Sequence, residues 1–183
     1  ESPVCLNDMS QKASAICDGT GTTRVFTVLS QAHAIFRDAT YADSQRIWEW
    51  RNKLNGIAKF SNEAVGFEQH DEWFSHAIQD PHRTIRIAMR DGNPCGYLRL
   101  DRISESRARV SICLAPESRG KNFGPQLLRE ADRLGEELGF IGLEAEVHLQ
   151  NMPSRKLFER AGYAQGTRTG SFLGFYRAIK DAT

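Results

Sequence analysis

Residues 118–125 combine positive charge and glycine in one short segment. Arg119 and Lys121 supply the charge, while Gly120 and Gly124 let the backbone come close to a ligand. An alternating apolar and polar run precedes this segment, and a run with apolar residues at helical spacing follows it, which predicts a strand, a tight loop and a helix. The free N–H groups and the dipole at a helix start favour an anion. The loop is therefore predicted to bind a pyrophosphate.

A second group of polar residues alternates with apolar ones between residues 141 and 149. In a strand, Glu144, Glu146 and His148 would share one face, and the intervening apolar residues would share the other. The apolar face must contact a core, so the polar face points either to solvent or into a cleft. Among the polar residues, His148 can exchange a proton near neutral pH.

The rest of the chain predicts the elements that hold these two segments. Strands are predicted at residues 34–39, 84–89, 95–103, 108–115 and 141–149, and as a pair within 163–179. Helices are predicted from Thr40 or Asp43 to about Arg51, at 66–79, from about 123 to 138, and at 152–161. Residues 53–62 show no clear period and are predicted to form a loop.

Length, charge and cysteine content exclude several classes of protein. The chain of 183 residues is long enough for one domain and an appendage. Its 24 basic and 23 acidic side chains leave a net charge of +1, which argues against a nucleic-acid or anionic-membrane partner. No apolar run approaches the roughly 20 residues of a membrane span. The cysteines lack metal-ligand spacing, so we expect no metal site, reduced thiols and a cytoplasmic protein.

Two motifs resemble those of the GNAT acetyltransferases. Residues 119–124 resemble the acyl-CoA signature (R/Q)-x-x-G-x-(G/A), with Asn122 in place of its middle glycine; asparagine tolerates left-handed backbone geometry better than most residues. Residues 151–163 resemble the stretch N-x-x-(A/S)-x-x-x-(Y/F)-x-x-x-G-(F/Y) that closes the coenzyme groove in this family. The order of predicted elements from about residue 34 to 180 is also that of the GNAT fold.

The resemblance implies an α/β (α+β) fold with a mixed, mostly antiparallel sheet, splayed between strands 4 and 5 and flanked by helices. It also implies that acetyl-CoA is bound in the splay. Main-chain groups of 112–114 and the Asn151 side chain would bind the pantetheine, and the N–H groups of 121–124 the phosphates. Arg119 and Arg155 would be charged partners, with an exposed helix cation as the alternative for Arg155. The implied coenzyme-binding residues are Ile112, Cys113, Leu114, Arg119, Gly120, Lys121, Asn122, Phe123, Gly124, Asn151, Ser154, Arg155 and Phe158.

The resemblance also implies the residues that move protons. In related aminosugar acetyltransferases a glutamate occupies the position of Glu146, which makes Glu146 a candidate general base, with His148 as the alternative. The simpler reading of both is exposed strand polarity. Phe158 stands where many family members have a tyrosine that protonates the CoA thiolate, and phenylalanine cannot donate a proton. Water, His148 or another tyrosine such as Tyr97 would take that role, or the thiolate would leave unassisted.

Two helical segments resemble acceptor-binding elements. Residues 48–52 and 70–74 resemble the W-R-N and H-x-x-W-(F/L) elements of acetyltransferases that act on nucleotide-linked 4-amino sugars, including those of pseudaminic acid biosynthesis. Arginine and aromatic rings suit a diphosphate and a uracil or sugar ring, whereas tryptophans at helical spacing are also typical of a core. The implied substrate residues are Arg51, Asn52, His70 and Trp73.

The N-terminal part of the chain suggests a separate origin. Residues 12–25 resemble the closing segment of nucleotide-sugar hydrolases related to GT-B glycosyltransferases. We therefore expect residues 1–31 to be the tail of an upstream domain or an N-terminal extension, and residues 32–183 to form the acetyltransferase domain. A nucleotide-sugar hydrolase would then be a fused or associated partner.

Together these patterns predict an acetyl-CoA-dependent N-acetyltransferase that acts by direct transfer. The expected acceptor is the amine of a UDP-linked amino-deoxy sugar in polysaccharide or nonulosonic acid biosynthesis. One alternative is an enzyme that acetylates a protein N terminus, of the ribosomal-protein type, or another small amine. The other alternative is a non-catalytic module that binds acyl-CoA.

Overall fold

The computed structural model describes residues 33–52 and 65–179. The predictions for residues 1–31 and for the loop at 53–62 lie outside these described residues. Within them the strands are β1 (Ile35–Asp38), β2 (Arg83–Arg90), β3 (Asn93–Arg102), β4 (Arg107–Leu114), β5 (Gly142–His148), β6 (Ala164–Thr169) and β7 (Phe172–Ala178). The helices are the 3-10 turn η1 (Tyr41–Asp43), α3 (Ser44–Asn52), α4 (Phe67–Ala77), the 3-10 turn η3 (Pro116–Ser118), α5 (Gly124–Glu137) and α6 (Met152–Arg160).

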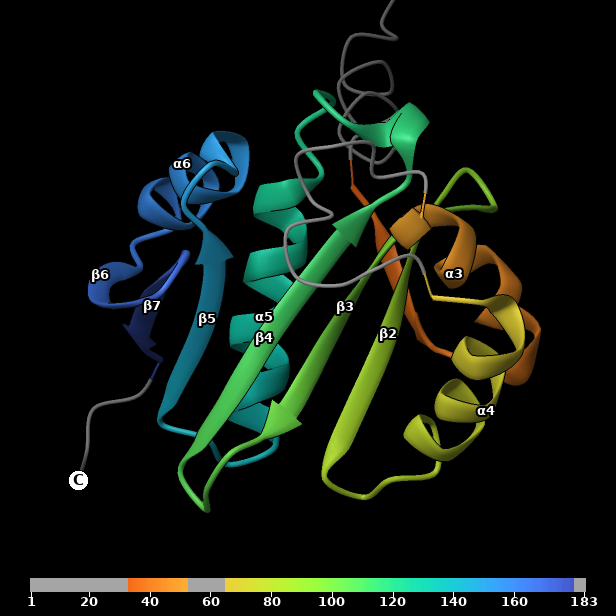
Figure 1. The fold of residues 1–183 in the computed structure, drawn as a ribbon, viewed down its shortest axis with the longest axis horizontal. Coiled ribbons are helices and arrows are strands. Elements are labelled where there is room, and N and C mark those ends of the chain that lie inside the picture. The colour runs from red at the N-terminus through yellow and green to blue at the C-terminus, as the bar shows by residue number, and fades with distance from the viewer. Residues whose placement is uncertain (1–32, 53–64, 180–183) are drawn as a thin grey trace, which may run out of the picture. The chain divides into compact units, whose positions relative to one another are not determined.

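The strands form one mixed sheet in the order β1-β2-β3-β4-β5-β7-β6. Strands β4 and β5 are parallel, and the other neighbours are antiparallel. Helix α5 lies on one face of the sheet, while α3 and α4 lie beside β2 toward the other face (Figure 1). This is the predicted GNAT fold, and the observed elements differ from the predicted ranges by a few residues at their ends. No helix among the described residues is long and apolar enough to cross a membrane.

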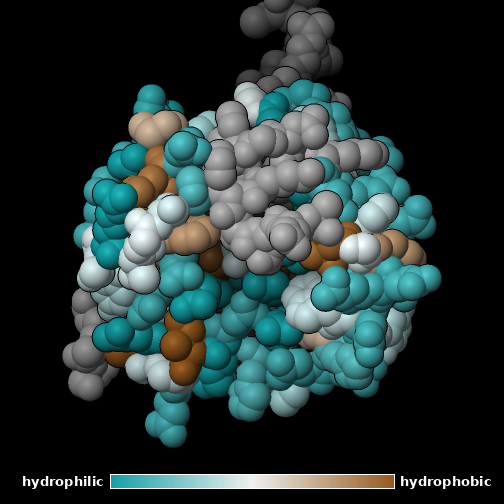
Figure 2. Space-filling view, in the orientation of Figure 1, coloured by the Kyte–Doolittle hydropathy of each residue, from teal (hydrophilic) through white to brown (hydrophobic). Residues whose placement is uncertain are grey.

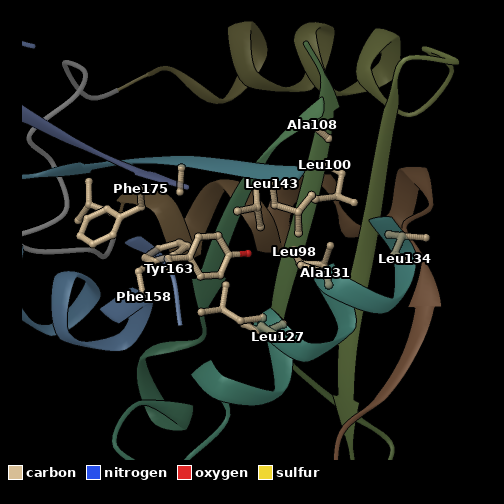
Figure 3. Close-up of a cluster of buried hydrophobic side chains, with 14 of the residues drawn as sticks. Leu98, Leu100, Ala108, Leu127, Ala131, Leu134, Leu143, Phe158, Tyr163 and Phe175 are labelled. Atoms are coloured by element: carbon tan, nitrogen blue, oxygen red, sulfur yellow. The ribbon is translucent and has the colours of Figure 1, made fainter. Parts of the chain in front are cut away.

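Helix α5 forms because its apolar residues recur at helical spacing on one side. Leu127, Ala131 and Leu134 from that side are buried against the sheet (Figure 3). Leu98 on β3 and Leu143 on β5 meet them from the sheet. Fully burying a leucine side chain stabilises a fold by about 1.5–3 kcal/mol, so this layer fixes the position of α5 and of the loop that precedes it.

A second apolar cluster lies on the opposite face of the sheet, because side chains along a strand alternate between faces. Tyr97, the neighbour of Leu98, packs there with Ile87 of β2. Trp50 of α3 and Phe74 of α4 complete the cluster. Trp50 therefore belongs to the core, which was the alternative prediction for tryptophans at helical spacing.

Strands β4 and β5 are paired only at one end. Their register joins residues 107–109 to residues 142–144 and stops there, and the strands then diverge toward the ends that carry the η3 turn and α6 (Figure 1). The other edge of β4 stays bonded to β3: the Ala115 N–H donates to the Cys95 carbonyl at 3.0 Å, and the Ile103 N–H donates to the Arg107 carbonyl at 2.9 Å. The predicted splay is therefore present.

This hydrogen-bond pattern shows which main-chain groups of β4 face the gap. Backbone groups alternate in direction along an antiparallel strand, so the odd-numbered residues of β4 bond to β3 and the even-numbered ones point toward β5. Ile112 and Leu114 therefore turn their N–H groups into the gap. The main chain of Cys113, which was also predicted to contact the coenzyme, bonds instead to β3, where its register partner is Tyr97.

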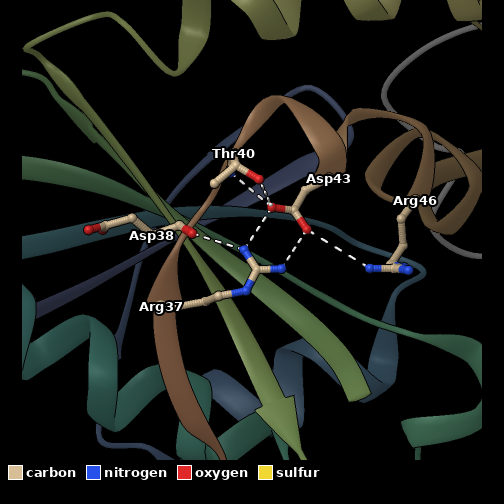
Figure 4. Close-up of polar contacts among 5 residues, drawn as sticks. All are labelled: Arg37, Asp38, Thr40, Asp43 and Arg46. Carbon is tan, nitrogen blue, oxygen red and sulfur yellow. Dashed lines mark hydrogen bonds and ion pairs between the residues drawn. The ribbon is translucent and has the colours of Figure 1, made fainter. Parts of the chain in front are cut away.

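The start of α3 is held by the buried carboxylate of Asp43 (Figure 4). Asp43 is 2% exposed, and its two oxygens accept hydrogen bonds from the two terminal nitrogens of Arg37 at 2.7 and 2.8 Å. The Thr40 N–H and hydroxyl also donate to this carboxylate, at 2.9 and 3.1 Å. Burial alone would raise the pKa of Asp43, but the Arg37 guanidinium and the Thr40 donors outweigh it and hold the pKa below its ordinary value.

The variant Asp43→Asn should lower the free energy of unfolding by about 1–3 kcal/mol at pH 7, because the Arg37 guanidinium loses its charged partner; the 38% exposure of Arg37 limits the loss. The folded carboxyl binds its proton less readily than the unfolded one. The contribution of Asp43 to the free energy of unfolding is therefore complete above about pH 4. It is lost as the pH falls through the pKa that the Asp43 carboxyl has in the folded protein. Urea unfolding between pH 3 and 7 measures this difference.

Asp38→Asn is the matched control, because Asp38 is 76% exposed and pairs with Arg86 at 2.9 Å. Its loss should cost less than about 1 kcal/mol. Equal unfolding free energies for the two variants at pH 7 would contradict the role given to Asp43.

Candidate functional site

The loop between β4 and α5 presents free main-chain donors. Gly120 and Asn122 adopt the left-handed backbone conformation, with φ angles of +72° and +62°. Asn122 therefore takes the geometry that a glycine at this position would provide. Among the described residues, the N–H groups of residues 120–124 have no hydrogen-bond partner. Such a run of donors at the start of a helix is suited to a phosphate.

Gly124 has a packing role in addition to its place in the loop. A Cβ atom there would lie 2.8 Å from Leu157 Cδ2 of α6, so glycine lets the start of α5 approach α6. Gln126 anchors the loop from below: its amide nitrogen donates to the Asn122 carbonyl at 3.3 Å, and its side-chain oxygen accepts from the Ala34 N–H at 2.7 Å. Both contacts fix the end of the loop that leads into α5.

A cavity of about 540 Å³ opens between this loop and α6. Gly120, Asn122, Phe123 and Gly124 line it together with Arg129, Lys156, Arg160 and Arg177. Arg177 is paired with Asp132 at 3.2 Å. Within the part of the chain that the structure describes, the other three cations have no carboxylate partner. These cations were not predicted from the sequence, although Lys156 and Arg160 stand four residues apart and so share one side of a helix. The cavity suits a polyanion of nucleotide size.

Glu146 lies at the fork where β4 and β5 separate. The last pair in the register joins Arg109 to Glu144, so Glu146 is the first polar side chain of β5 beyond it. It is 54% exposed and lies 3.8 Å from the Arg109 guanidinium. The neighbouring apolar residues of β5 belong to the α5 core, so Glu146 points to the opposite face. The visible surface over the middle of the sheet is largely hydrophilic (Figure 2).

His148 lies on the same face of β5 as Glu146, one pair of residues further along the strand. Its Nδ1 atom accepts a hydrogen bond from the Gln150 N–H at 3.2 Å, and its ring meets Phe172 edge-on with 5.3 Å between centroids. A neutral imidazole whose Nδ1 accepts carries its proton on Nε2. His148 is therefore held in one orientation at the open end of the gap.

The predicted groove residues of α6 have contacts within the protein. Asn151 caps the helix, since its side-chain oxygen accepts from the Ser154 N–H at 3.2 Å; its amide nitrogen has no partner among the described residues. Arg155 donates from Nη1 to the Leu149 carbonyl at 3.2 Å. Neither the cap nor this bond was predicted, and both fix the turn that follows β5. Arg155 is thus tied to the end of β5 and is not a free helix cation.

Phe158 is a core residue. It is buried between Tyr163, whose ring meets it edge-on at 5.0 Å, and Phe175, which stacks on it at 5.6 Å (Figure 3). Burial raises the pKa of Tyr97 well above its ordinary value, with the charges of Arg51 and Arg99 opposing the shift. Tyr97 is therefore a weaker acid than a free tyrosine.

Three of the four predicted substrate residues meet at one cavity. Arg51, His70 and Trp73 line a space of about 330 Å³ together with Arg99 of β3. Asn52 is not part of it, because its side chain donates to the Val65 carbonyl at 3.3 Å. This bond connects the end of α3 with the residues before α4.

His70 is buried in this cavity, and its environment favours the uncharged ring. Its side chain is 3% exposed, and its Nε2 atom lies 3.1 Å from the Ser44 carbonyl. A carbonyl only accepts hydrogen bonds, so Nε2 carries the proton and Nδ1 is an acceptor. Burial and the nearby charge of Arg51 lower the pKa of His70.

The end of β4 connects the two halves of the site. Burial raises the pKa of the Cys113 thiol to about 12, and the charges of Arg119 and Arg51 both oppose this shift. Arg119 belongs to the loop between β4 and α5 and Arg51 to the cavity beside Trp73, so both lie within electrostatic reach of one residue. The thiol itself is buried, which is typical of an unreactive core cysteine.

Comparison with known proteins gives a consistent result. One relative, a protein of Bacillus subtilis (strain 168) with the provisional name phosphinothricin acetyltransferase YwnH, is 34% identical over 109 residues. The alignment covers 56% of this chain and 66% of the relative, slightly less than two thirds of its length.

Solved structures share the fold at lower identity. A spermidine N-acetyltransferase from Vibrio cholerae, in complex with CoA and spermine, has a TM-score of 0.73 at 20% identity, over 81% of this chain and 96% of that one. A GNAT superfamily phosphinothricin acetyltransferase from Sinorhizobium meliloti, in complex with AcCoA, has a TM-score of 0.70 at 24% identity, over 82% and 90%.

The family model gives the widest match to the sequence itself. It covers residues 36–163, which is more than half of the chain and includes both motifs and the fork between β4 and β5. The chain therefore belongs to the acetyltransferase (GNAT) family, as the two motifs predicted.

Proposed function

We propose that this protein transfers the acetyl group of acetyl-CoA directly to the amine of a small molecule. The observation that carries this proposal is the fork between β4 and β5. Its free edge at Ile112 and Leu114 leads to the donors of residues 120–124. Pantetheine has amide groups that can bond to a free strand edge, and the pyrophosphate suits the donors of the loop. The cations around the larger cavity favour the remaining phosphate of the coenzyme.

The reaction needs a base for the amine and space beside the thioester. The amine nitrogen attacks the thioester carbonyl, the new C–N bond forms and the C–S bond breaks. The proton released by the nitrogen passes to Glu146, directly or through one water. Glu146 suits this role because it stands at the fork on the side of the acceptor cavity. Phe158 has no proton to give and Tyr97 is a weak acid, so the CoA thiolate takes its proton from solvent.

The acceptor is a small molecule in this proposal, as the cavity beside Trp73 supports. Its volume of about 330 Å³ and its lining of Arg51 and Arg99 suit part of a nucleotide-linked amino sugar, the acceptor expected from the sequence. A protein N terminus would call for an open, acidic cleft of peptide size. The nucleotide sugar and the associated hydrolase remain parts of this proposal.

The variant Glu146→Gln should lower kcat by about 10²–10⁴-fold, the usual contribution of a general base. The measurement is CoA release at saturating acetyl-CoA with a panel of UDP-4-amino sugars, other small amines and N-terminal peptides. Glu144→Gln is the matched control, because Glu144 lies on the same face of β5 within the paired region and contacts Arg107 at 3.1 Å. Unchanged turnover of Glu146→Gln at neutral pH would exclude Glu146 as the base. A large loss in His148→Ala alone would assign that role to His148.

The variant Asn122→Val should raise the KM for acetyl-CoA about tenfold, because a bulky residue in the left-handed conformation costs about 1–2 kcal/mol and displaces the donors of the loop. Asn122→Gly should keep KM within about threefold, since glycine adopts this conformation freely. Initial rates and calorimetric titration with CoA measure both effects. If the valine variant binds CoA as tightly as the unsubstituted protein, the loop does not hold the phosphates.

CoA binding without turnover of any amine would support the non-catalytic alternative.

A further inference from the structure

We propose that Arg51 and Arg99 bind an anionic group of the acceptor beside the ring of Trp73, and that the neighbouring Arg83 adds to the positive charge there. The acceptor would then be an amine that also carries a phosphate, phosphonate or carboxylate. This inference rests on the proposed function and specifies its substrate class. Arg83 and Arg99 had no role in the sequence analysis.

The three guanidinium groups converge on one aromatic ring from three elements. The Cζ atoms of Arg83 on β2 and Arg99 on β3 each lie 5.5 Å from the centroid of the Trp73 ring. The Cζ atom of Arg51, at the end of α3, lies 5.9 Å from it. A cation beside a tryptophan face is stabilised by the ring quadrupole, but one ring does not neutralise three positive charges. The arrangement therefore keeps an unbalanced positive field.

The nearby carboxylate balances only part of this charge. Asp101 pairs with both strand arginines, through Oδ1 to Arg83 Nε and through Oδ2 to Arg99 Nε, the latter at 2.9 Å. Among the residues that the structure describes, no carboxylate pairs with Arg51. Three guanidinium groups against one carboxylate leave two positive charges. Like charges held this close repel one another in a partly buried site, and an oxyanion between them would remove that cost.

The position of this arginine cluster suits the acceptor and not the coenzyme. Arg99 lies opposite Ser111 of β4 in the sheet register, on the face of the sheet that also carries Glu146. Neighbouring strands lie about 4.8 Å apart where they are paired, so β3 and β5 are at least about 10 Å apart across β4, and further apart beyond the last pair at Glu144. A small molecule can span that distance with its anion at the cluster and its amine at the fork.

The same field argues against a polyamine acceptor. A molecule that carries only positive charges would be repelled by the cluster, and none of the described residues that line the cavity is a carboxylate. Arginine forms two parallel hydrogen bonds with a phosphate or carboxylate. The cluster therefore selects the acceptor by charge as well as by shape.

The test uses phosphoethanolamine as a probe, with ethanolamine, which lacks the phosphate, as its match and spermidine as an amine that carries several positive charges. Calorimetry on the CoA-saturated protein measures the affinity for each probe, because CoA blocks the other phosphate site. We expect phosphoethanolamine to bind at least tenfold more tightly than the other two. Arg51→Gln should raise its Kd at least tenfold, and Arg51→Lys should recover part of the loss. Equal binding of the three amines, or unchanged binding in Arg51→Gln, would overturn the inference.

Arg46→Gln is the matched control, since it removes one arginine from the same helix at a position that contacts Asp43 at 3.9 Å and not Trp73. It should leave phosphoethanolamine binding unchanged. An unchanged Kd for CoA in Arg51→Gln shows that this variant is folded. If Arg46→Gln weakens probe binding as much as Arg51→Gln does, the effect is one of overall charge and the site is wrongly assigned.

CoA release distinguishes a failure of this inference from a failure of the proposed function. Faster acetylation of spermidine than of any anionic amine would overturn the inference while supporting acetyl transfer. Binding of phosphoethanolamine that depends on Arg51, without acetylation of any amine tested, would support the anion site and contradict the proposed function.

Discussion

The end of the pairing between β4 and β5 is the constraint on which the rest of the site depends. Pairing stops after Arg109 and Glu144, and both strands are held on their outer edges, by β3 and by β7. The gap is therefore built into the sheet and does not need a ligand to open it. A free strand edge inside a sheet exposes main-chain donors and acceptors, and a ligand with amide groups can satisfy them. Everything else in the site lies at or around this gap.

Three local features fix the two sides of the gap between β4 and β5. The left-handed residues Gly120 and Asn122 turn the chain so that α5 begins at the mouth of the gap with its N–H groups free. On the other side, Asn151 caps α6 and Arg155 binds the Leu149 carbonyl, which fixes the end of β5. Asn151 and Arg155, two residues of the predicted coenzyme motif, therefore also stabilise the structure around the gap. They hold the shape that a flexible ligand must fit.

The acceptor side is organised by the buried carboxylate of Asp43. It joins the end of β1 to the first turns of α3 through Arg37 and Thr40, and so sets where Arg51 at the far end of that helix lies. Arg51 then meets two arginines from the sheet beside Trp73. The specificity proposed for the acceptor thus depends on a structural ion pair elsewhere in the domain.

Local patterns in the sequence were sufficient for the fold and for the backbone conformation of the loop before α5. Alternation and helical spacing predicted the described elements in order, and the type of residue at 120 and 122 matched the backbone it had to adopt. The arginine cluster could not be predicted from local patterns in the sequence. Arg83 and Asp101 face each other only because of the β2–β3 register, and Arg51 joins them only through tertiary packing. The same limit hid the core position of Phe158 and the main-chain direction of Cys113, which follow from neighbours far away in the sequence.

The central claim is that the coenzyme binds to the free edge of β4 and to the loop that follows it. Amide hydrogen exchange measured by NMR, with and without CoA, tests this most directly. The account predicts that CoA slows exchange at Ile112, Leu114 and residues 120–124, while Ser111 and Cys113 change little because β3 already protects them. Unchanged exchange at Ile112 and Leu114 under saturating CoA, or equal slowing at odd and even positions of β4, would contradict it.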